Sequence, residues 1–125
     1  MRLLLDTHVL LWVMADDPSL PSAARAIINK AEVVYVSAVS LWEISIKIGL
    51  GKLNVDQERL SRRLIDAGFE PLNITWNHAE AVGHLPDIHR DPFDRMLIAQ
   101  AVTEPLKLLT ADKVLAKYSD LVLTV

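Results

Sequence analysis

The sequence lacks several features that are typical of secreted, membrane or repeat proteins. The 125 residues include no cysteine, which excludes disulfide bonds and cysteine-ligated zinc and leaves nothing that argues for export. No apolar run approaches the roughly 20 residues that a membrane-spanning helix needs. No internal repeat, linker-like stretch or low-complexity tract occurs either. We therefore expect a globular protein without a membrane segment.

The apolar N-terminal segment, MRLLLDTHVLLWVMADD, lacks the features of a signal peptide. Asp6 and His8 interrupt it, and no cleavage pattern of small residues follows. A chain of 125 residues has the usual size of one domain with its own hydrophobic core. We expect a single domain over residues 1–125, located in the cytoplasm.

An excess of positive charge is missing as well. The net charge is −3, whereas domains that bind nucleic acid are usually basic. Five acids could form one cluster, and without their five negative charges the remainder carries +2: Asp6, Glu43, Asp91, Asp94 and Asp112. Divalent ions bound in such a cluster would neutralise it and let phosphate approach. The net charge therefore does not exclude a nucleic-acid substrate.

Short aliphatic runs alternate along the chain with longer segments of helical spacing. The runs are residues 3–5, 33–36, 72–74, 106–109 and 121–123. The helical segments are residues 8–17, 21–31, 38–48, 56–67, 75–84 and 92–104. Strands that are apolar on both faces and alternate with helices are typical of a parallel sheet covered by helices on each side. The pattern predicts an α/β fold.

Helix signals support this interpretation. Ser37 ends the second run and can cap the helix that follows it. Gly68 stands after the fourth helical segment, where a glycine commonly ends a helix. The segment 92–104 is apolar nearly all round, which is typical of a buried helix.

The five acids fall where ligands bind in an open parallel sheet, at the carboxyl ends of the strands. Asp6 directly follows the first run and Asp112 comes just after the fourth. Glu43 lies nearly two helical turns after the second run, and Asp91 and Asp94 open the buried helix. Four separate segments therefore direct carboxylates toward one edge of the sheet.

Each acid also has a local explanation. Asp6 and Asp112 could cap the helices that follow them, and Asp91 before a proline is a favourable helix cap. Glu43 could pair with Lys47 on the surface of a helix. Capping does not explain why all five acids gather at one edge, because clustered carboxylates repel unless they are protonated or bind metal.

A set of oxygen ligands favours Mg²⁺ or Mn²⁺ over zinc. Mg²⁺ sites in proteins commonly use few carboxylates and complete the shell with waters and the phosphates of the substrate. One or two such ions can polarise a phosphodiester and lower the pKa of an attacking water. The acids therefore suggest phosphodiester hydrolysis.

Four sequence blocks in this order resemble PIN-domain ribonucleases, and most closely the VapC-type toxins of type II toxin–antitoxin pairs. The blocks are LLLDTHVLLW, VSAVSLWEISIKIGLGKL, LPDIHRDPFDRMLIAQA and LLTADKVLAKY, which together span essentially the whole chain. The resemblance implies a three-layer fold with a central parallel sheet of four or five strands. It also implies an endoribonuclease that depends on one or two Mg²⁺ or Mn²⁺ ions. The implied partners are an RNA substrate, a cognate antitoxin and a second copy of the chain.

The resemblance also implies roles for particular residues. The four acids of the family correspond to Asp6, Glu43, Asp94 and Asp112, which would hold the metal and activate water. Thr110 matches a supporting position whose hydroxyl can hold a ligand carboxylate or a bound water. Asp91 belongs to the DPFDR variant of the motif and is either a helix cap or an auxiliary ligand. His8 stands where many relatives have Asn or Ser; it could touch substrate or be a partly buried polar residue, and we expect the latter.

Basic and aromatic residues lie near the acids in sequence. The flanking basic residues are Lys47, Lys52, Arg90, Arg95 and Lys113, of which we expect one or two to contact RNA phosphates, with Lys47 and Arg90 as candidates. Three tryptophans are interleaved with aliphatic residues and are expected in the core or a dimer interface rather than stacked on bases: Trp12, Trp42 and Trp76. Three histidines, His78, His84 and His89, show no metal-ligand spacing and receive no role.

Two other functions stay open at this stage. The first is a PIN-like nuclease that acts on DNA or precursor RNA without an antitoxin; the short chain, with no room for an added RNA-binding domain, disfavours it. The second is a non-catalytic binding module of the same fold whose acids serve only as caps. The presence of all four acids disfavours a degenerate copy of this kind.

Overall fold

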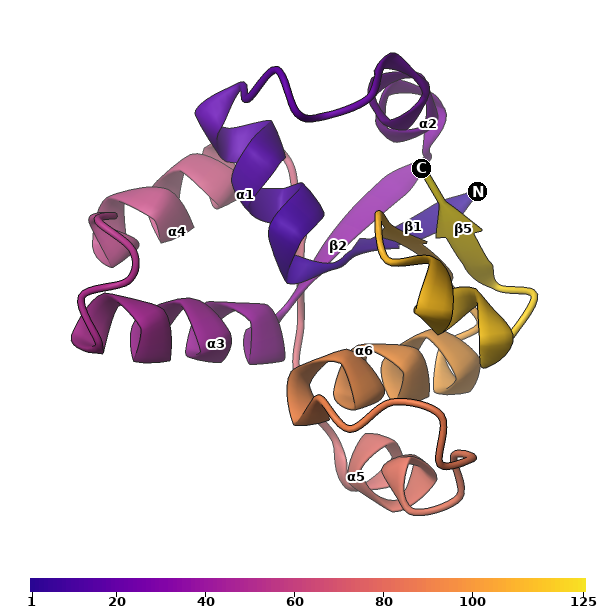
Figure 1. Ribbon diagram of the computed structural model, residues 1–125. Coiled ribbons are helices and arrows are strands. Elements are labelled where there is room, and N and C mark those ends of the chain that lie inside the picture. Colours follow the sequence, from indigo (N-terminus) through magenta and orange to yellow (C-terminus); the bar gives the residue numbers. More distant parts are fainter.

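The computed structural model describes residues 1–125 and contains one five-stranded sheet in which all neighbouring strands are parallel (Figure 1). The strands are β1 (Arg2–Leu5), β2 (Val33–Ser37), β3 (Glu70–Leu72), β4 (Lys107–Thr110) and β5 (Val122–Thr124), in the order β3-β2-β1-β4-β5. The helices are α1 (Thr7–Ala15), α2 (Ser22–Lys30), α3 (Ala38–Gly49), α4 (Gln57–Asp66), α5 (Trp76–Val82), α6 (Pro92–Thr103) and the 3-10 helix η1 (Lys113–Lys117). The predicted α/β fold with a central parallel sheet is confirmed.

Side chains of the central strands alternate between two hydrophobic cores, one on each face of the sheet. Leu3, Leu5 and Leu109 pack in the first core, which includes residues of α1, α2, α3 and α4. Leu4 and Leu108 pack in the second core, with residues of α6 and η1. Because successive side chains of a strand point to opposite faces, an apolar run of three or four residues supplies both cores at once.

The buried character of α6 follows from this arrangement. Residues 97–101 of this helix are all buried, as expected for a helix that is apolar nearly all round. Helix α6 packs against α5 and the sheet, so that its first turn faces the carboxyl end of β1 and β4 (Figure 1).

One prediction about apolar runs is wrong, and one about the tryptophans is confirmed only for Trp12. Strand β3 ends at Leu72 instead of spanning 72–74, and Ile74 is exposed, because β3 is a short edge strand that pairs only with β2. Trp42 and Trp76 lie outside the cores, with 59% and 88% of their surface exposed, whereas Trp12 packs against the first core. Core packing is therefore confirmed for Trp12 alone, and a dimer interface stays a prediction for Trp42 and Trp76.

None of the helices has both the length and the apolar character needed to span a bilayer.

The strand order creates a topological switch point beside β1, where the chain connections change from one side of the strand to the other. The chain leaves β1 through α1 and α2 on one face to reach β2, and it returns to the other side of β1 through α6 and β4. Diverging connections of this kind open a crevice at the carboxyl ends of the two strands. The ends of β1 and β4 are the positions of Asp6 and Thr110.

Candidate metal centre

The carboxyl end of β1 joins that of β4 through Asp6. The Asp6 backbone N–H donates to the carbonyl oxygen of Leu109 at 3.1 Å, which continues the pairing of the two strands. Oδ1 of the Asp6 side chain accepts from the Val9 N–H at 2.8 Å and caps α1. The other oxygen, Oδ2, accepts from the Thr110 hydroxyl. Asp6 is therefore a helix cap and a member of the cluster at once.

Thr110 connects two of the acids. Its hydroxyl donates to Asp6, and its Oγ1 accepts from the backbone N–H of Asp112 at 3.0 Å. The threonine is fully buried, so its position is fixed by the sheet. Asp112 in turn caps η1, since its Oδ1 accepts from the Val114 N–H at 3.0 Å. The predicted supporting position of Thr110 is thus in direct contact with the acid cluster.

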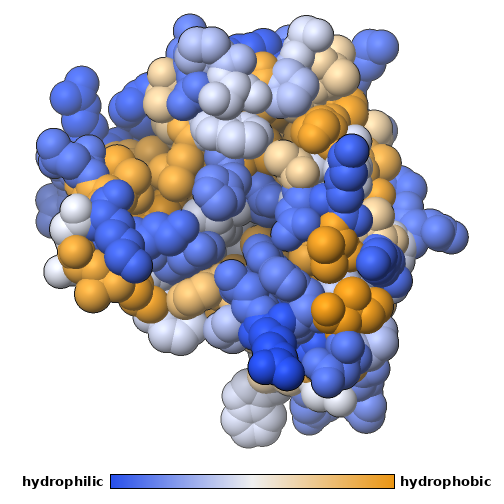
Figure 2. Space-filling view, in the orientation of Figure 1, coloured by the Kyte–Doolittle hydropathy of each residue, from blue (hydrophilic) through white to orange (hydrophobic).

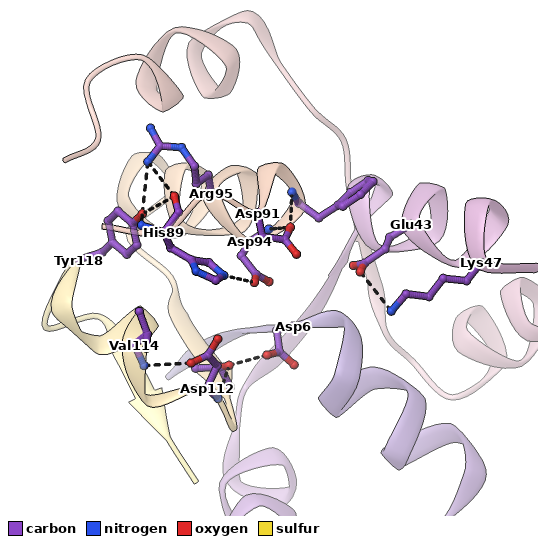
Figure 3. Close-up of polar contacts among 12 residues, drawn as sticks. Asp6, Glu43, Lys47, His89, Asp91, Asp94, Arg95, Asp112, Val114 and Tyr118 are labelled. Atoms are coloured by element: carbon purple, nitrogen blue, oxygen red, sulfur yellow. Dashed lines mark hydrogen bonds and ion pairs between the residues drawn. The ribbon is translucent and has the colours of Figure 1, made fainter. Parts of the chain in front are cut away.

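Asp91 caps the helix that carries Asp94. Its Oδ1 accepts from the backbone N–H groups of Phe93 at 2.8 Å and Asp94 at 3.1 Å. The following proline occupies the first helical position, as expected for this type of helix start. The cap directs the first turn of α6, and with it the Asp94 carboxylate, toward the end of β1 (Figure 3).

Glu43 approaches the other acids from α3. It forms the predicted ion pair with Lys47, with Nζ and Oε2 3.3 Å apart, and its side chain is only 14% exposed. A buried hydrogen bond from the Thr7 hydroxyl to the Ser40 hydroxyl, 2.9 Å long, holds the first turn of α1 against α3. Because Thr7 follows Asp6, this bond fixes the position of α3 beside the cluster.

These side chains surround one hollow that has no apolar lining residue. The hollow is lined by the five acids and by Thr7, His8, Lys47 and His89. In the space-filling view, the region between α1, α3 and α6 is hydrophilic and recessed (Figure 2). All five acids of the sequence analysis are therefore brought together, from the end of β1, from α3, from the start of α6 and from the segment after β4.

The environment raises the pKa of two of the acids. Burial raises the pKa of Asp6 from its usual 3.8, and the hydrogen bonds from Thr110 and Val9 partly oppose this rise. Burial, followed by the neighbouring charge of Asp91, raises the pKa of Asp94 to about 6, against a hydrogen bond from His89 that lowers it. Without a cation, negative charge in the hollow is therefore unfavourable, and a bound cation would reverse this effect.

His89 is the residue that the sequence analysis missed. Its Nε2 lies 3.0 Å from Oδ2 of Asp94. One ring nitrogen of His89 and one carboxylate oxygen each of Asp94 and Asp112 lie within 4.8 Å of one another. No helical spacing marks His89, because it lies in the loop before α6; its nearness to the DPFDR block was the one available signal.

The remaining candidates divide into residues inside and outside the hollow. Lys47 lines the hollow. Arg90 is exposed and instead lines a neighbouring, mostly apolar hollow beside Trp42 and Ile74. The expectation that His8 is partly buried is wrong, since it is exposed and lines the acid-rich hollow, with its ring centroid 6.1 Å from that of Trp12.

Comparison with known proteins agrees with this architecture. Ribonuclease VapC22 of Mycobacterium tuberculosis is 28% identical over 121 residues, covering 88% of this chain and 86% of that protein. A VapBC2 complex from Rickettsia felis bound to a promoter DNA fragment contains a chain of similar fold, with a TM-score of 0.70. The two chains are 14% identical, and the match covers 100% of this chain and 98% of that chain. A toxin–antitoxin complex from Klebsiella pneumoniae contains another, with a TM-score of 0.67, 19% identity, and coverage of 97% and 95%.

A match to a protein-family model shows the family of this chain. The family model of the PIN domain matches residues 3–121, a range that includes all five clustered acids and nearly all residues of both cores. The chain therefore belongs to the PIN-domain family.

Proposed function

We propose that the chain is an endoribonuclease that depends on Mg²⁺ or Mn²⁺ and acts as the toxin of a toxin–antitoxin pair. The observation that carries this proposal is the gathering of acids from four elements around one hydrophilic hollow at the switch point of the sheet. The similarity to Ribonuclease VapC22 supports RNA as the substrate.

The donor groups of the hollow fit a hard divalent cation. Its proposed ligands are carboxylate oxygens of Asp6, Glu43, Asp94 and Asp112, and oxygen ligands suit Mg²⁺ and Mn²⁺. The raised pKa of Asp94 supports a site whose negative charges become favourable only beside a cation. When one or two ions are bound, they would polarise the scissile phosphate and lower the pKa of the attacking water.

The protein's own residues hold the acids in place for this chemistry. Thr110 fixes Asp6 through its hydroxyl and Asp112 through the backbone. Asp91 acts as the cap that orients Asp94, and its second carboxylate oxygen makes no hydrogen bond and remains available to an ion or a water. In our proposal Asp91 is therefore an auxiliary ligand at most.

Two basic residues are proposed to bind the RNA backbone. The Lys47 side chain lines the hollow and is 32% exposed, so its ammonium group can reach a phosphate next to the acids. Arg90 lies outside the hollow and would contact a phosphate farther along the RNA. Such contacts would make affinity for RNA fall with rising salt concentration.

The proposed protein partners are a cognate antitoxin and a second copy of the chain. The structures of similar fold from Rickettsia felis and Klebsiella pneumoniae are toxin–antitoxin complexes, which supports an antitoxin. Three apolar side chains spaced four residues apart are exposed along α3 and at its C-cap, namely Trp42, Ile46 and Leu50 at 59%, 38% and 64%. Exposed apolar patches often mark protein-binding surfaces, and we propose that the second copy covers this one.

The test is RNA cleavage by the purified chain, freed of any partner, in Mg²⁺, in Mn²⁺ and in EDTA. We expect cleavage with either ion, none in EDTA, and none from an Asp94→Asn variant prepared in the same way. Asp120→Asn, which changes an exposed aspartate outside the hollow, is the matched control and should cut as the wild type does. Cleavage at the wild-type rate by both Asp6→Asn and Asp94→Asn would refute the proposal.

A further inference from the structure

His89 faces the acids with its imidazole ring (Figure 3). Its Nε2 and Oδ2 of Asp94 are 3.0 Å apart, and Asp112 contributes a third potential ligand atom within 4.8 Å of both. Neighbouring ligand atoms of an octahedral ion with bonds of about 2.1 Å are about 3 Å apart. The separation between His89 and Asp94 therefore suits two ligands of one ion.

The loop that carries His89 is fixed by Tyr118, which lies 29 residues later in the sequence, and by Arg95 at the start of α6. The His89 N–H donates to the Tyr118 hydroxyl at 2.8 Å, and that hydroxyl donates to the His89 carbonyl oxygen at 3.2 Å. Arg95 donates from Nη1 to the Tyr118 hydroxyl at 3.2 Å and from Nη2 to the Val82 carbonyl oxygen at 3.1 Å. Arg95 is thus a structural residue, and with Tyr118 it holds the backbone of His89 beside the hollow.

Two roles for the ring are compatible with a distance of 3.0 Å to Asp94. The ring could donate a hydrogen bond from Nε2 and only position the carboxylate, or Nε2 could bind the ion itself. The second role requires the tautomer with its proton on Nδ1. No group of the chain hydrogen-bonds to that nitrogen, so the structure does not impose the other tautomer. A positioning role would involve Asp94 alone. It would not account for the carboxylate oxygen of Asp112 that lies within 4.8 Å of a His89 ring nitrogen.

We propose that His89 is a metal ligand together with Asp94 and Asp112, and that its nitrogen makes the site prefer Mn²⁺ to Mg²⁺. This inference rests on the proposed function, which it extends from an all-oxygen site to a mixed one. Imidazole nitrogen binds first-row transition ions more readily than Mg²⁺, whose sites consist of oxygen atoms. Asp6 and Glu43 line the same hollow but lie outside this group of three.

The variant that separates the two roles is His89→Gln. A glutamine can still donate a hydrogen bond to Asp94, so it preserves a positioning role, but it removes the imidazole nitrogen. Titration calorimetry should show Mn²⁺ affinity reduced by about tenfold or more, with Mg²⁺ affinity changed by less than about threefold. His84→Gln, which changes an exposed histidine outside the hollow, is the matched control and should bind both ions as the wild type does.

Pulsed electron paramagnetic resonance on the Mn²⁺-loaded protein tests the nitrogen directly. We expect a coupling from a directly bound nitrogen in the wild type and its loss in His89→Gln. Bound Mn²⁺ without this coupling, or a coupling that survives in His89→Gln, would overturn the inference. Metal-dependent RNA cleavage by the wild type would then leave the proposed function intact, whereas a wild type that binds neither ion would refute both.

Discussion

The raised pKa of Asp94 has a direct consequence for stability. In the metal-free protein a rise from 3.8 to about 6 corresponds to at most about 3 kcal/mol, and solvent screening of this partly exposed carboxyl reduces that figure. Because the folded state holds the proton more tightly than the unfolded state, this group lowers the free energy of unfolding as the pH rises through about 6. Asp94→Asn removes the charge and keeps an oxygen that can accept from His89. We expect the metal-free variant to be more stable than the wild type at pH 8, by up to about 3 kcal/mol, and equally stable near pH 4.

The assay is urea unfolding in EDTA at a series of pH values between 4 and 8, followed by tryptophan fluorescence. A gain of up to about 3 kcal/mol would raise the urea concentration at the midpoint by up to roughly 1–3 M. Adding Mn²⁺ should then stabilise the wild type and leave Asp94→Asn nearly unchanged, since a ligand stabilises only the state that binds it. Asp120→Asn should stay within about 0.5 kcal/mol of the wild type at every pH. A variant less stable than the wild type at pH 8, or a difference independent of pH, would refute the reasoning.

Three further predictions concern the parts that support the site. Thr110→Val should lower the free energy of unfolding by about 1–3 kcal/mol in urea, because it removes the buried hydroxyl that donates to Asp6; no loss would contradict its linking role. Leu97→Ala, at a fully buried position of α6, should cost about 2–5 kcal/mol, against almost nothing for Val102→Ala on the exposed face. Trp42→Ser should shift sedimentation toward the monomer with unchanged circular dichroism, and an unaltered sedimentation coefficient would remove this surface from the proposed dimer.

The alternatives that the sequence left open for the acids were not exclusive. Asp6 caps α1 with one carboxylate oxygen and accepts from Thr110 with the other. Glu43 pairs with Lys47 on the same helix and still lines the hollow. A carboxylate has two oxygens and several lone pairs, so a local role and a shared site can coexist in one side chain. The local patterns were therefore correct, but they could not decide between the two roles.

Residues outside regular elements were the hardest to place. His89 owes its position to Tyr118, which lies 29 residues later, and no spacing within its own loop signals that contact. The exposure of Trp42 and Trp76 likewise depends on which helix neighbours lie beside them. Hydrophobic patterns report whether a segment can form a strand or a helix, and they do not report what packs against each residue.

The sequence by itself determined the types and order of the elements and the placement of acids at the carboxyl ends of strands, because alternation, helix caps and apolar runs are local signals. Only the tertiary structure decided which side chains meet. Thr110 contacts Asp6 across 104 residues because β4 pairs directly with β1. The packing of α3 and the contacts of the loop before α6 bring Lys47 and His89, and not Arg90 and His84, to the hollow that the acids line. Strand order is a property of the whole packed chain, and the geometry of the site follows from it.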